Sequence, residues 1–494
     1  MKDNSSLKIS NLASFAKLER FLEARRDPSS KESELNFEEF EVRVDRLSHE
    51  LESEIKALEL SRYDVEVSSI SINGELLRKC LEKEPKRYMT ASGPITVERC
   101  LYRPQGGGKS ICPLELRAGI VGGVYTPVLA RQMTYMMGNM TSVETSKLFD
   151  EMNIEGPSSS SCDRLPKIVS ERWEEYRTEW EDALREQETV PAEAAVLAAS
   201  LDGVMVADKD GQREAKLKRE EAMKKNLSKQ YSGPAGYKEV GCGTVTLYGE
   251  KQEGDEEIPR LETVRYGRAP EYKKKTLTEQ LDAEVGSILS VRPDLVLVAI
   301  ADGAEENWRY FDRYAYKDAV KITDFGHACE HLRAAVVAYA GKKSIAGRAE
   351  YEKLKVILKE QDDGAEEVIK QLTSMERKLK GKKNKKKREL LHAELLYFEN
   401  QKDRMRYAEY QRRGLPIGSG VIEASCKTLA TQRMKRSGLS WRDGKQPILT
   451  IRSLQQSDRW ERAWKLISNS YRDDVMSVQD HGHLQELTPV RVAS

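Results

Sequence analysis

The chain has 494 residues, of which 33% are charged and 39% are hydrophobic. This length exceeds what one compact core accommodates and suggests about three domains. Because 82 basic and 81 acidic side chains leave a net charge of +1, any surface that binds nucleic acid must be a local patch.

The sequence lacks the patterns of a membrane or secreted protein. No run of about 18 apolar residues occurs, and the opening MKDNSSLKISNLASF lacks the apolar core of a signal peptide. Seven cysteines are scattered without a CxxC pair, which argues against a disulfide framework or a zinc knuckle. Cys100 and Cys112 could pair, bind metal or remain buried free thiols. We therefore expect a cytoplasmic protein that does not contact membranes.

Residues 1–62 are predicted to be helical, because from Phe37 the apolar positions step by three and four. That helix could form a short coiled coil or pack on its own domain. The strand-like segments DVEVSSISI and GPITVERCLYR predict a small strand-rich domain at 63–122. The sequence GGGKS within it is interpreted as a turn, since Arg103 stands where a phosphate-binding loop needs its first glycine.

Residues 123–194 are predicted to be helical and to close with an acidic linker. The segment SVETSKLFDEMNIEGPSSSSCDRLPKIVSERW contains a helix, a turn and a serine-capped helix, which is the outline of a helix-turn-helix. Helical hairpins that do not touch DNA share this outline, so a DNA-binding region and a plain hairpin both stay open.

Residues 195–345 alternate between strands and helices. AVLAASLDGVMVA, YKEVGCGTVTLYG and ETVRYGRA are predicted strands, TLTEQLDAEVGSIL a helix, and DLVLVAIADGA and AVKITDF two further strands. This order predicts an α/β domain with an antiparallel meander and a helical crossover into a parallel strand. Residues 346–412 are almost continuously helical and polar, which predicts an inserted arm. Its basic run Lys378–Arg388 would hold phosphates or form a solvated face.

Two aspartates follow hydrophobic runs in the α/β block. Asp202 ends or interrupts the first strand, Asp302 ends the fourth, and each precedes a glycine. A carboxylate at the carboxyl end of a buried strand points into the crevice where such sheets bind ligands. Each Asp-Gly pair could instead be a simple turn. With one more acid, the two would offer the hard oxygen ligands that Mg²⁺ or Mn²⁺ prefers.

That further acid is Glu423, which opens a basic segment in region 413–470, ahead of a predicted tail at 471–494. Glycines around Ser419 supply a candidate N-cap, which would place Glu423 in the first turns of a helix. A carboxylate that holds a cation while its helix lies along a phosphate backbone fits this layout. The alternative is a capped surface helix with an ion pair to Lys427. The basic residues that would bind DNA are Lys427, Arg433, Lys435 and Arg436.

The motifs SLDGVMV, ADGAEENW, DFGHACEHL and LPIGSGVIEASCKTLATQRMKRSGLSW together resemble the ISKra4 family of bacterial insertion-sequence transposases, which are DDE enzymes. The resemblance implies a ribonuclease H-like core, with a mixed five-stranded sheet, helices and a helical insertion, behind an α+β N-terminal DNA-binding region. It implies that Asp202, Asp302 and Glu423 are catalytic and coordinate two Mg²⁺ or Mn²⁺ ions. Asp324 and His327 match a motif of related transposases, which implies that they support the active site or position a DNA phosphate or flipped base without binding the metals.

The implied activity is DNA transposition. The protein would bind double-stranded DNA at terminal inverted repeats, hydrolyse a phosphodiester and join the 3′ hydroxyl to target DNA. Because two ends must be brought together, we expect a homo-oligomer on DNA, associated with the bacterial nucleoid. One alternative is a transposase-derived DNA-binding regulator that no longer cuts. A more distant one is a zinc metalloprotease, in which the H-x-x-E-H pattern of HACEH would supply His327 and His331, with Glu394 or Glu399 as the third ligand.

Overall fold

The structure, a computed structural model, describes residues 8–224, 236–252, 257–436, 439–478 and 484–486. The chain divides into two compact units. The first unit contains Met1–Trp180 and Trp460–Ser494, and the second unit contains Glu181–Arg459. The second unit thus begins before the predicted start of the α/β block at 195.

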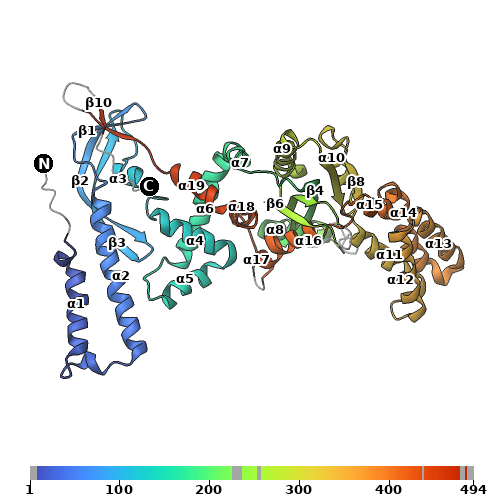
Figure 1. Ribbon diagram of the computed structural model, residues 1–494, viewed down its shortest axis with the longest axis horizontal. Helices are drawn as coiled ribbons and strands as arrows, with labels where there is room; N and C mark the ends of the chain where they lie inside the picture. The colour runs from blue at the N-terminus through green and yellow to red at the C-terminus, as the bar shows by residue number, and fades with distance from the viewer. Residues whose placement is uncertain (1–7, 225–235, 253–256, 437–438, 479–483, 487–494) are drawn as a thin grey trace. The chain divides into compact units, whose positions relative to one another are not determined.

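The first unit contains a five-stranded sheet in the order β10-β9-β1-β2-β3 (Figure 1). Its neighbouring strands are all antiparallel. The C-terminal strand β9 pairs with β1, with Ile70 opposite Ser477, so part of the predicted tail joins this sheet. Other parts of that tail, residues 479–483 and 487–494, lie outside the described residues. The strands are β1 Ser69–Ile72, β2 Glu75–Thr90, β3 Gly93–Pro104, β9 Val475–Val478 and β10 Leu484–Glu486.

Helices complete the first unit. A capping box between Asn36 and Glu39 starts α2, the long helix predicted from Phe37. Its buried Leu60 joins a core cluster with Tyr88 and Ile95 of the sheet, so α2 packs within its own unit. The helices are α1 Ala13–Arg26, α2 Phe37–Ser61, α3 Pro113–Ala118, α4 Pro127–Asn139, α5 Ser142–Glu151, α6 Ser159–Glu175, α7 Arg177–Arg185, which crosses into the second unit, and α19 Trp460–Asn469. DNA binding by the α5–α6 pair stays a prediction.

The second unit is built on a mixed five-stranded sheet in the order β6-β5-β4-β7-β8 (Figure 1). Strands β6, β5 and β4 form the predicted antiparallel meander, while β7 and β8 continue the sheet in parallel with β4. This topology is consistent with the predicted ribonuclease H-like core. The strands are β4 Ala194–Ala207, β5 Tyr237–Gly249, β6 Arg260–Arg268, β7 Val296–Ala301 and β8 Val320–Thr323.

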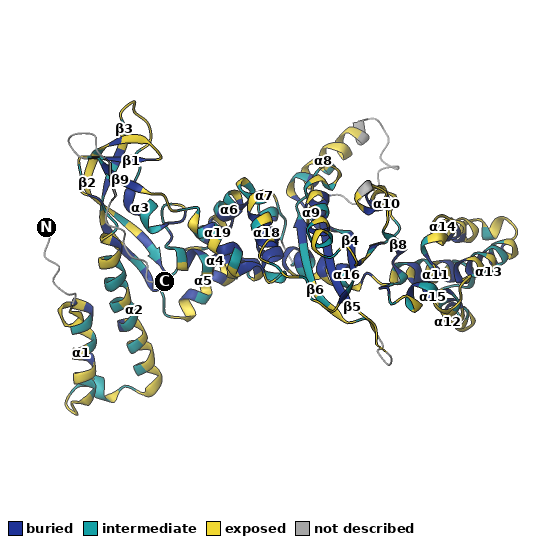
Figure 2. Ribbon diagram, turned by 45° about the horizontal axis from the view of Figure 1, so that its top comes forward, coloured by how far each residue is buried: buried dark blue, intermediate teal, exposed yellow. Residues whose placement is uncertain are grey.

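Helices cover and bury both faces of this sheet (Figure 2). Alternate residues of a strand point to opposite faces, so a single strand contributes to the cores on both sides. Odd-numbered residues of β4 such as Leu197 pack into one core cluster with α9 (Lys275–Val291) and α10 (Glu305–Phe311). Ala198 packs into another with α11 (Phe325–Ala340). Further along the same face, Val204 packs against α16 (Gly420–Ser425) and α18 (Lys445–Gln456). Position 202 falls between these two clusters.

The segment predicted as an inserted arm is helical. It contains α12 (Ile345–Glu360), α13 (Gly364–Lys378), α14 (Lys385–Gln401) and α15 (Tyr407–Arg412), with α8 (Lys209–Lys224) elsewhere in the unit. Leu332 of α11, Leu372 of α13 and Leu395 of α14 share one buried cluster with the sheet. The arm therefore continues the core of the second unit.

A buried ionic network lies where the chain enters and leaves the second unit. Arg459 Nη2 lies 2.7 Å from Glu284 Oε1 and 2.5 Å from Glu188 Oε2. The side chains of Arg459 and Glu284 are only 3% and 2% exposed, so each charge depends on the other for compensation.

None of the described helices is long and apolar enough to cross a bilayer. All seven cysteines are free, and Cys100 and Cys112 are buried thiols.

Candidate active site

Three aspartates form a row across the second unit's sheet. The parallel ladder pairs Ser200 with Ile300, and two residues further along both strands stand Asp202 and Asp302. The next ladder pairs Ala301 with Thr323, so Asp302 directly after β7 is level with Asp324 directly after β8. Asp202 belongs by alternation to the face covered by α11 and α16, and the charges of all three aspartates act on His327 of α11. Asp202 does not end β4. It marks the point where β7 stops pairing with β4.

Hydrogen bonds fix the carboxylate of Asp302. Its Oδ1 accepts from the backbone N–H of Ala304 at 2.9 Å and from Asn307 Nδ2 at 3.0 Å. Asn307 is buried on α10, which starts directly after this turn. The first turn of α10 therefore orients the second predicted catalytic acid.

Helix α14 holds the backbone of the same turn. The hydroxyl of Tyr397 donates to the carbonyl of Asp302 at 3.0 Å, and Gln401 Nε2 donates to the carbonyl of Gly303 at 3.1 Å. Gly303 has φ +103°, and a Cβ there would lie 2.7 Å from the Tyr397 ring. Only glycine fits this turn, because any side chain would strain the backbone and displace the ring.

Asp324 connects β8 to two helices. It is 1% exposed, and its Oδ1 accepts from the backbone N–H of His327 at 2.6 Å, which caps α11. Its Oδ2 accepts from the backbone N–H of Ser419, directly before α16. Burial alone would raise the pKa of Asp324, but these bonds outweigh it and hold the pKa below its usual value. Asp324 thus joins the starts of both helices to the sheet.

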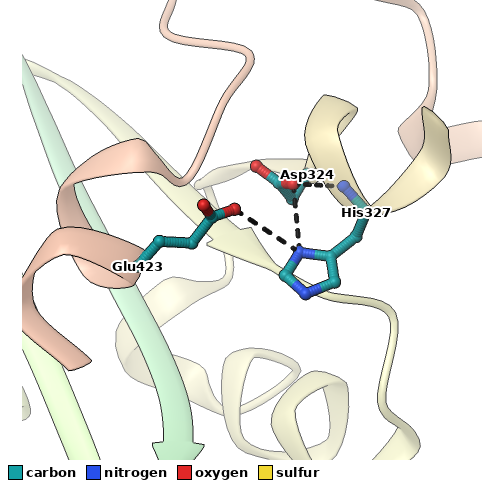
Figure 3. A group of neighbouring side chains, drawn as sticks. All are labelled: Asp324, His327 and Glu423. Atoms are coloured by element: carbon teal, nitrogen blue, oxygen red, sulfur yellow. Dashed lines mark hydrogen bonds and ion pairs between the residues drawn. The ribbon is translucent and has the colours of Figure 1, made fainter. Parts of the chain in front are cut away.

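His327 lies between carboxylates (Figure 3). Its Nδ1 is 3.1 Å from Asp324 Oδ1 and 4.0 Å from Glu423 Oε1. The hydrogen bond to Asp324 raises the pKa of His327 to about 9, and the charges of Asp302 and Asp202 add to the effect. The carboxylates around His327 therefore favour its protonated form. Among the described residues, Glu423 has its ionic contact with this histidine and not with Lys427.

Glu423 lies in the first turn of α16, as predicted. The helix continues through a π-helical turn, Cys426–Thr431, into α17, Gln432–Met434. Such π turns occur frequently at functional sites. Cys426 Sγ in this turn donates to Asp202 Oδ2 at 3.4 Å. Its thiol also bonds Cys242, which is the main reason that the pKa of Cys426 is raised. The helix that carries Glu423 is thereby fixed against Asp202.

Two overlapping sets of side chains could hold a metal ion. Within the described residues, Asp324, His327 and Glu423 have candidate ligand atoms within 4.8 Å of one another. The predicted set shares only Glu423 with this group. Asp324 is fully buried, whereas Asp202 and Asp302 are partly exposed, so these two are the more accessible oxygen donors although each also accepts hydrogen bonds. Carboxylates are the donors that Mg²⁺ and Mn²⁺ prefer, so the residues fit such ions.

The predicted DNA-binding residues are in different environments. Lys427 and Lys435 are exposed and Arg436 is partly exposed. Arg433 is 4% exposed, and its guanidinium lies 5.2 Å from the ring centre of Trp441. Its placement supports packing between α17 and the following segment and does not support a phosphate contact. The motif residues 437–438 lie outside the described part of the chain.

A second buried ion pair anchors the segment that follows α17. Lys445 Nζ lies 2.5 Å from Asp208 Oδ2, just beyond β4. Burial alone would raise the pKa of Asp208, but the bonds from Lys445 and from the backbone of Gly211 leave the pKa below its usual value. This pair ties α18 to the strand that carries Asp202.

The two histidines of HACEH do not share a ligand site. His331 Nδ1 lies 2.6 Å from Glu394 Oε2, and its ring stacks on Tyr397 with 3.6 Å between ring centres. His327 instead bonds Asp324. Within the described residues, the two rings are thus committed to separate acids, which argues against a zinc protease. His331 supports the tyrosine that holds Asp302.

No known protein-family model matches the chain, and no curated protein matches it. Among solved structures, the chain is similar to the Drosophila P element transposase in its strand transfer complex, at 11% sequence identity. The match covers 72% of this chain and 87% of that chain, with a TM-score of 0.23. We carry no residue role across at that TM-score, and infer function from the site geometry.

Sequence reasoning missed several residues that shape the site. Tyr397 and Gln401 stand four apart, which places them on one side of a helix, but they bind backbone atoms that no pattern reveals. Asn307, five residues after Asp302, gave no signal by its spacing. For Arg433 a signal existed, because it stands four residues after the buried Leu429 on the apolar stripe.

Proposed function

We propose that this protein is a DNA transposase of the DDE type, related to the ISKra4 insertion-sequence family, that cuts and joins DNA with two divalent cations. The observation that carries the proposal is the alignment of Asp202 with Asp302 on neighbouring strands, beneath the helix that carries Glu423. Carboxylates brought together from two neighbouring strands and a covering helix suit hard divalent cations.

Each residue has a role in the proposed reaction. Asp202, Asp302 and Glu423 would hold Mg²⁺ or Mn²⁺, which when bound supplies charge to activate a nucleophile and to stabilise the phosphate in the transition state. Asp324 would position the catalytic helix through Ser419. His327, which hydrogen-bonds Asp324 and lies 4.0 Å from Glu423, would support the active site or position a DNA phosphate. Exposed Lys427 and Lys435 would bind the adjoining backbone phosphates.

The partners of the proposed transposase are terminal inverted repeats and target DNA. Because both ends of an element must be held together, we expect a homo-oligomer on DNA.

A cleavage assay tests the proposal. Purified protein is mixed with duplexes that carry the sequences flanking its gene, in Mg²⁺ or Mn²⁺, and nicks are mapped on end-labelled strands. Asp302→Asn and Glu423→Gln should abolish cleavage while DNA binding persists. The matched controls Asp318→Asn and Glu399→Gln change exposed acids of the same unit and should cut normally.

One outcome favours the second candidate, a DNA-binding regulator derived from a transposase. If the unaltered protein binds DNA specifically but neither cation supports cleavage or joining, the transposase proposal fails and the regulator stands. If it does not bind DNA, both fail.

A further inference from the structure

A basic cluster occupies one end of the helical arm. Eight of the eleven residues from Lys378 to Arg388 are lysine or arginine, and no acid falls between Glu376 and Glu389. All eight basic side chains are exposed. Leu379, in contrast, is buried in the arm's core, so the run is anchored to the fold. It forms the end of α13, a 3-10 turn at Lys382–Asn384 and the start of α14.

A second basic segment joins this run. Lys387 Nζ donates to the carbonyl of Tyr339 at 3.4 Å, which brings the start of α14 to the end of α11. Three residues beyond Tyr339, Lys342 and Lys343 are both exposed. We call Lys342, Lys343 and the eight basic residues of Lys378–Arg388 the arm-end cluster.

The arm-end cluster is electrostatically unfavourable in the protein alone. Lys385–Arg388 occupy the first turn of α14, which has neither an acidic residue nor a side-chain cap. Positive charge beside the free N–H groups of a helix start is unfavourable at low ionic strength, and the neighbouring cations repel one another. A polyanion lying across the cluster would relieve both effects.

Two helices set the distance from the arm-end cluster to the candidate active site. Helix α11 starts at the site, where Asp324 caps it, and ends beside the cluster. Helix α14 runs the other way, from the cluster to Tyr397 and Gln401 at the Asp302 turn. At about 1.5 Å per residue, these stretches span roughly 15 to 23 Å. That distance equals about four to seven base pairs of duplex at 3.4 Å each.

We propose that the arm-end cluster binds the phosphate backbone of a DNA duplex about four to seven base pairs from the phosphodiester held at the acidic site. The position relative to a cut rests on the proposed function, whereas the binding of duplex does not. DNA is the favoured partner because its phosphates form an extended row of regular negative charge that two adjoining basic connections can follow.

Salt-dependent binding tests the proposal. Lys382, Lys383 and Lys386 are changed together to Gln, which keeps the bonds of Lys385 and Lys387. The control changes Lys353, Lys359 and Lys370, exposed lysines of α12 and α13, to Gln. Binding of a 30-bp mixed-sequence duplex (~30 bp spans the two sites with room to spare) is followed by fluorescence anisotropy over a KCl series. Each lost phosphate contact reduces the slope of log K against log salt by about 0.9, so the arm-end variant should lose about 2 to 3 and the control none.

Further outcomes separate the two proposals. If DNA binding depends on these lysines but no metal-dependent cleavage occurs, the proposal that the arm-end cluster binds DNA is supported and the transposase proposal fails. Equal slopes for the unaltered protein and both variants overturn the DNA surface even if cleavage is normal. Preference for an RNA duplex of the same sequence, lost in the arm-end variant, would overturn it in favour of RNA. Lys383→Gln alone, expected to change the slope by about 0.9, serves if the triple variant fails to fold by circular dichroism.

Discussion

Removal of the Tyr397 hydroxyl group should make the orientation of Asp302 less fixed without removing any of the proposed metal ligands. In Tyr397→Phe the aromatic ring remains against Gly303 and His331, but the hydrogen bond to the carbonyl of Asp302 is lost. Gln401 still holds the neighbouring carbonyl, so the turn persists with one fewer support. We expect Asp302 to sample orientations that a divalent cation cannot use.

The size of the effect follows from the one lost bond. A single hydrogen bond contributes about 1 kcal/mol net, and an unsatisfied carbonyl costs about 1 to 3 kcal/mol. If about 1 kcal/mol of that is expressed at Asp302, the affinity for a divalent cation falls about fivefold. The free energy of unfolding should fall by about the same 1 kcal/mol.

Two measurements distinguish a positioning role from simple stability. Mn²⁺ binding is followed by electron paramagnetic resonance without DNA, and unfolding by urea titration. Tyr102→Phe, which removes a hydroxyl that donates to the Val65 carbonyl at 2.8 Å in the first unit, is the matched control. It should lower stability alone. If Tyr397→Phe likewise destabilises but leaves the Mn²⁺ affinity unchanged, the tyrosine is structural and our reasoning is wrong.

Further substitutions test individual charged side chains, both buried and exposed. Arg433→Ala should lower the free energy of unfolding by about 1 to 3 kcal/mol, measured by urea titration, because a packed side chain is lost. Lys435→Ala should instead weaken DNA binding and reduce its salt slope by about 0.9 with an unchanged melting temperature. Arg459→Met should cost about 3 to 5 kcal/mol in urea unfolding, since the buried Glu284 loses its closest counter-ion and the partly exposed Glu188 loses its partner as well. Asp208 has a lowered pKa in the folded protein, so it stabilises above its unfolded value near 3.9, and this contribution is lost as pH falls through the folded pKa. Asp208→Asn should therefore be less stable at pH 7, with a difference that shrinks below about pH 4; a difference independent of pH would contradict the ion-pair explanation.

Much of the second unit's sheet was predictable, because each of its main strands is a run of hydrophobic residues that can be recognised in the sequence. The runs ending near Asp202 and Asp302 fixed two strands, and the helix between them implied a parallel pairing. The register could not be predicted, since one residue of slip would preserve every hydrophobic run. Asp324 was identified only through a resemblance, and the sheet explains its importance by placing it level with Asp302.

Residues that hold the site by binding backbone atoms could not be predicted from the sequence. The polar helix α14 gives no sign that Tyr397 and Gln401 face a turn almost a hundred residues upstream. Strand β9 escaped for a related reason, because four residues of weak alternation become a strand only beside β1. Such contacts depend on tertiary partners that a local pattern does not contain.

The aspartate row also determines where this chain tolerates changes in length. Because successive strand residues alternate between faces, insertion or deletion of one residue within β7 would turn Asp302 away from Asp202 and Asp324. The segment between α11 and α14 is not subject to this alternation. The start of α11 and the end of α14 are the parts of these helices that contact the sheet. A change of whole turns in α12 or α13 leaves this alternation intact, and the limit on their length is set instead by buried residues such as Leu358 and Leu372 of the core cluster.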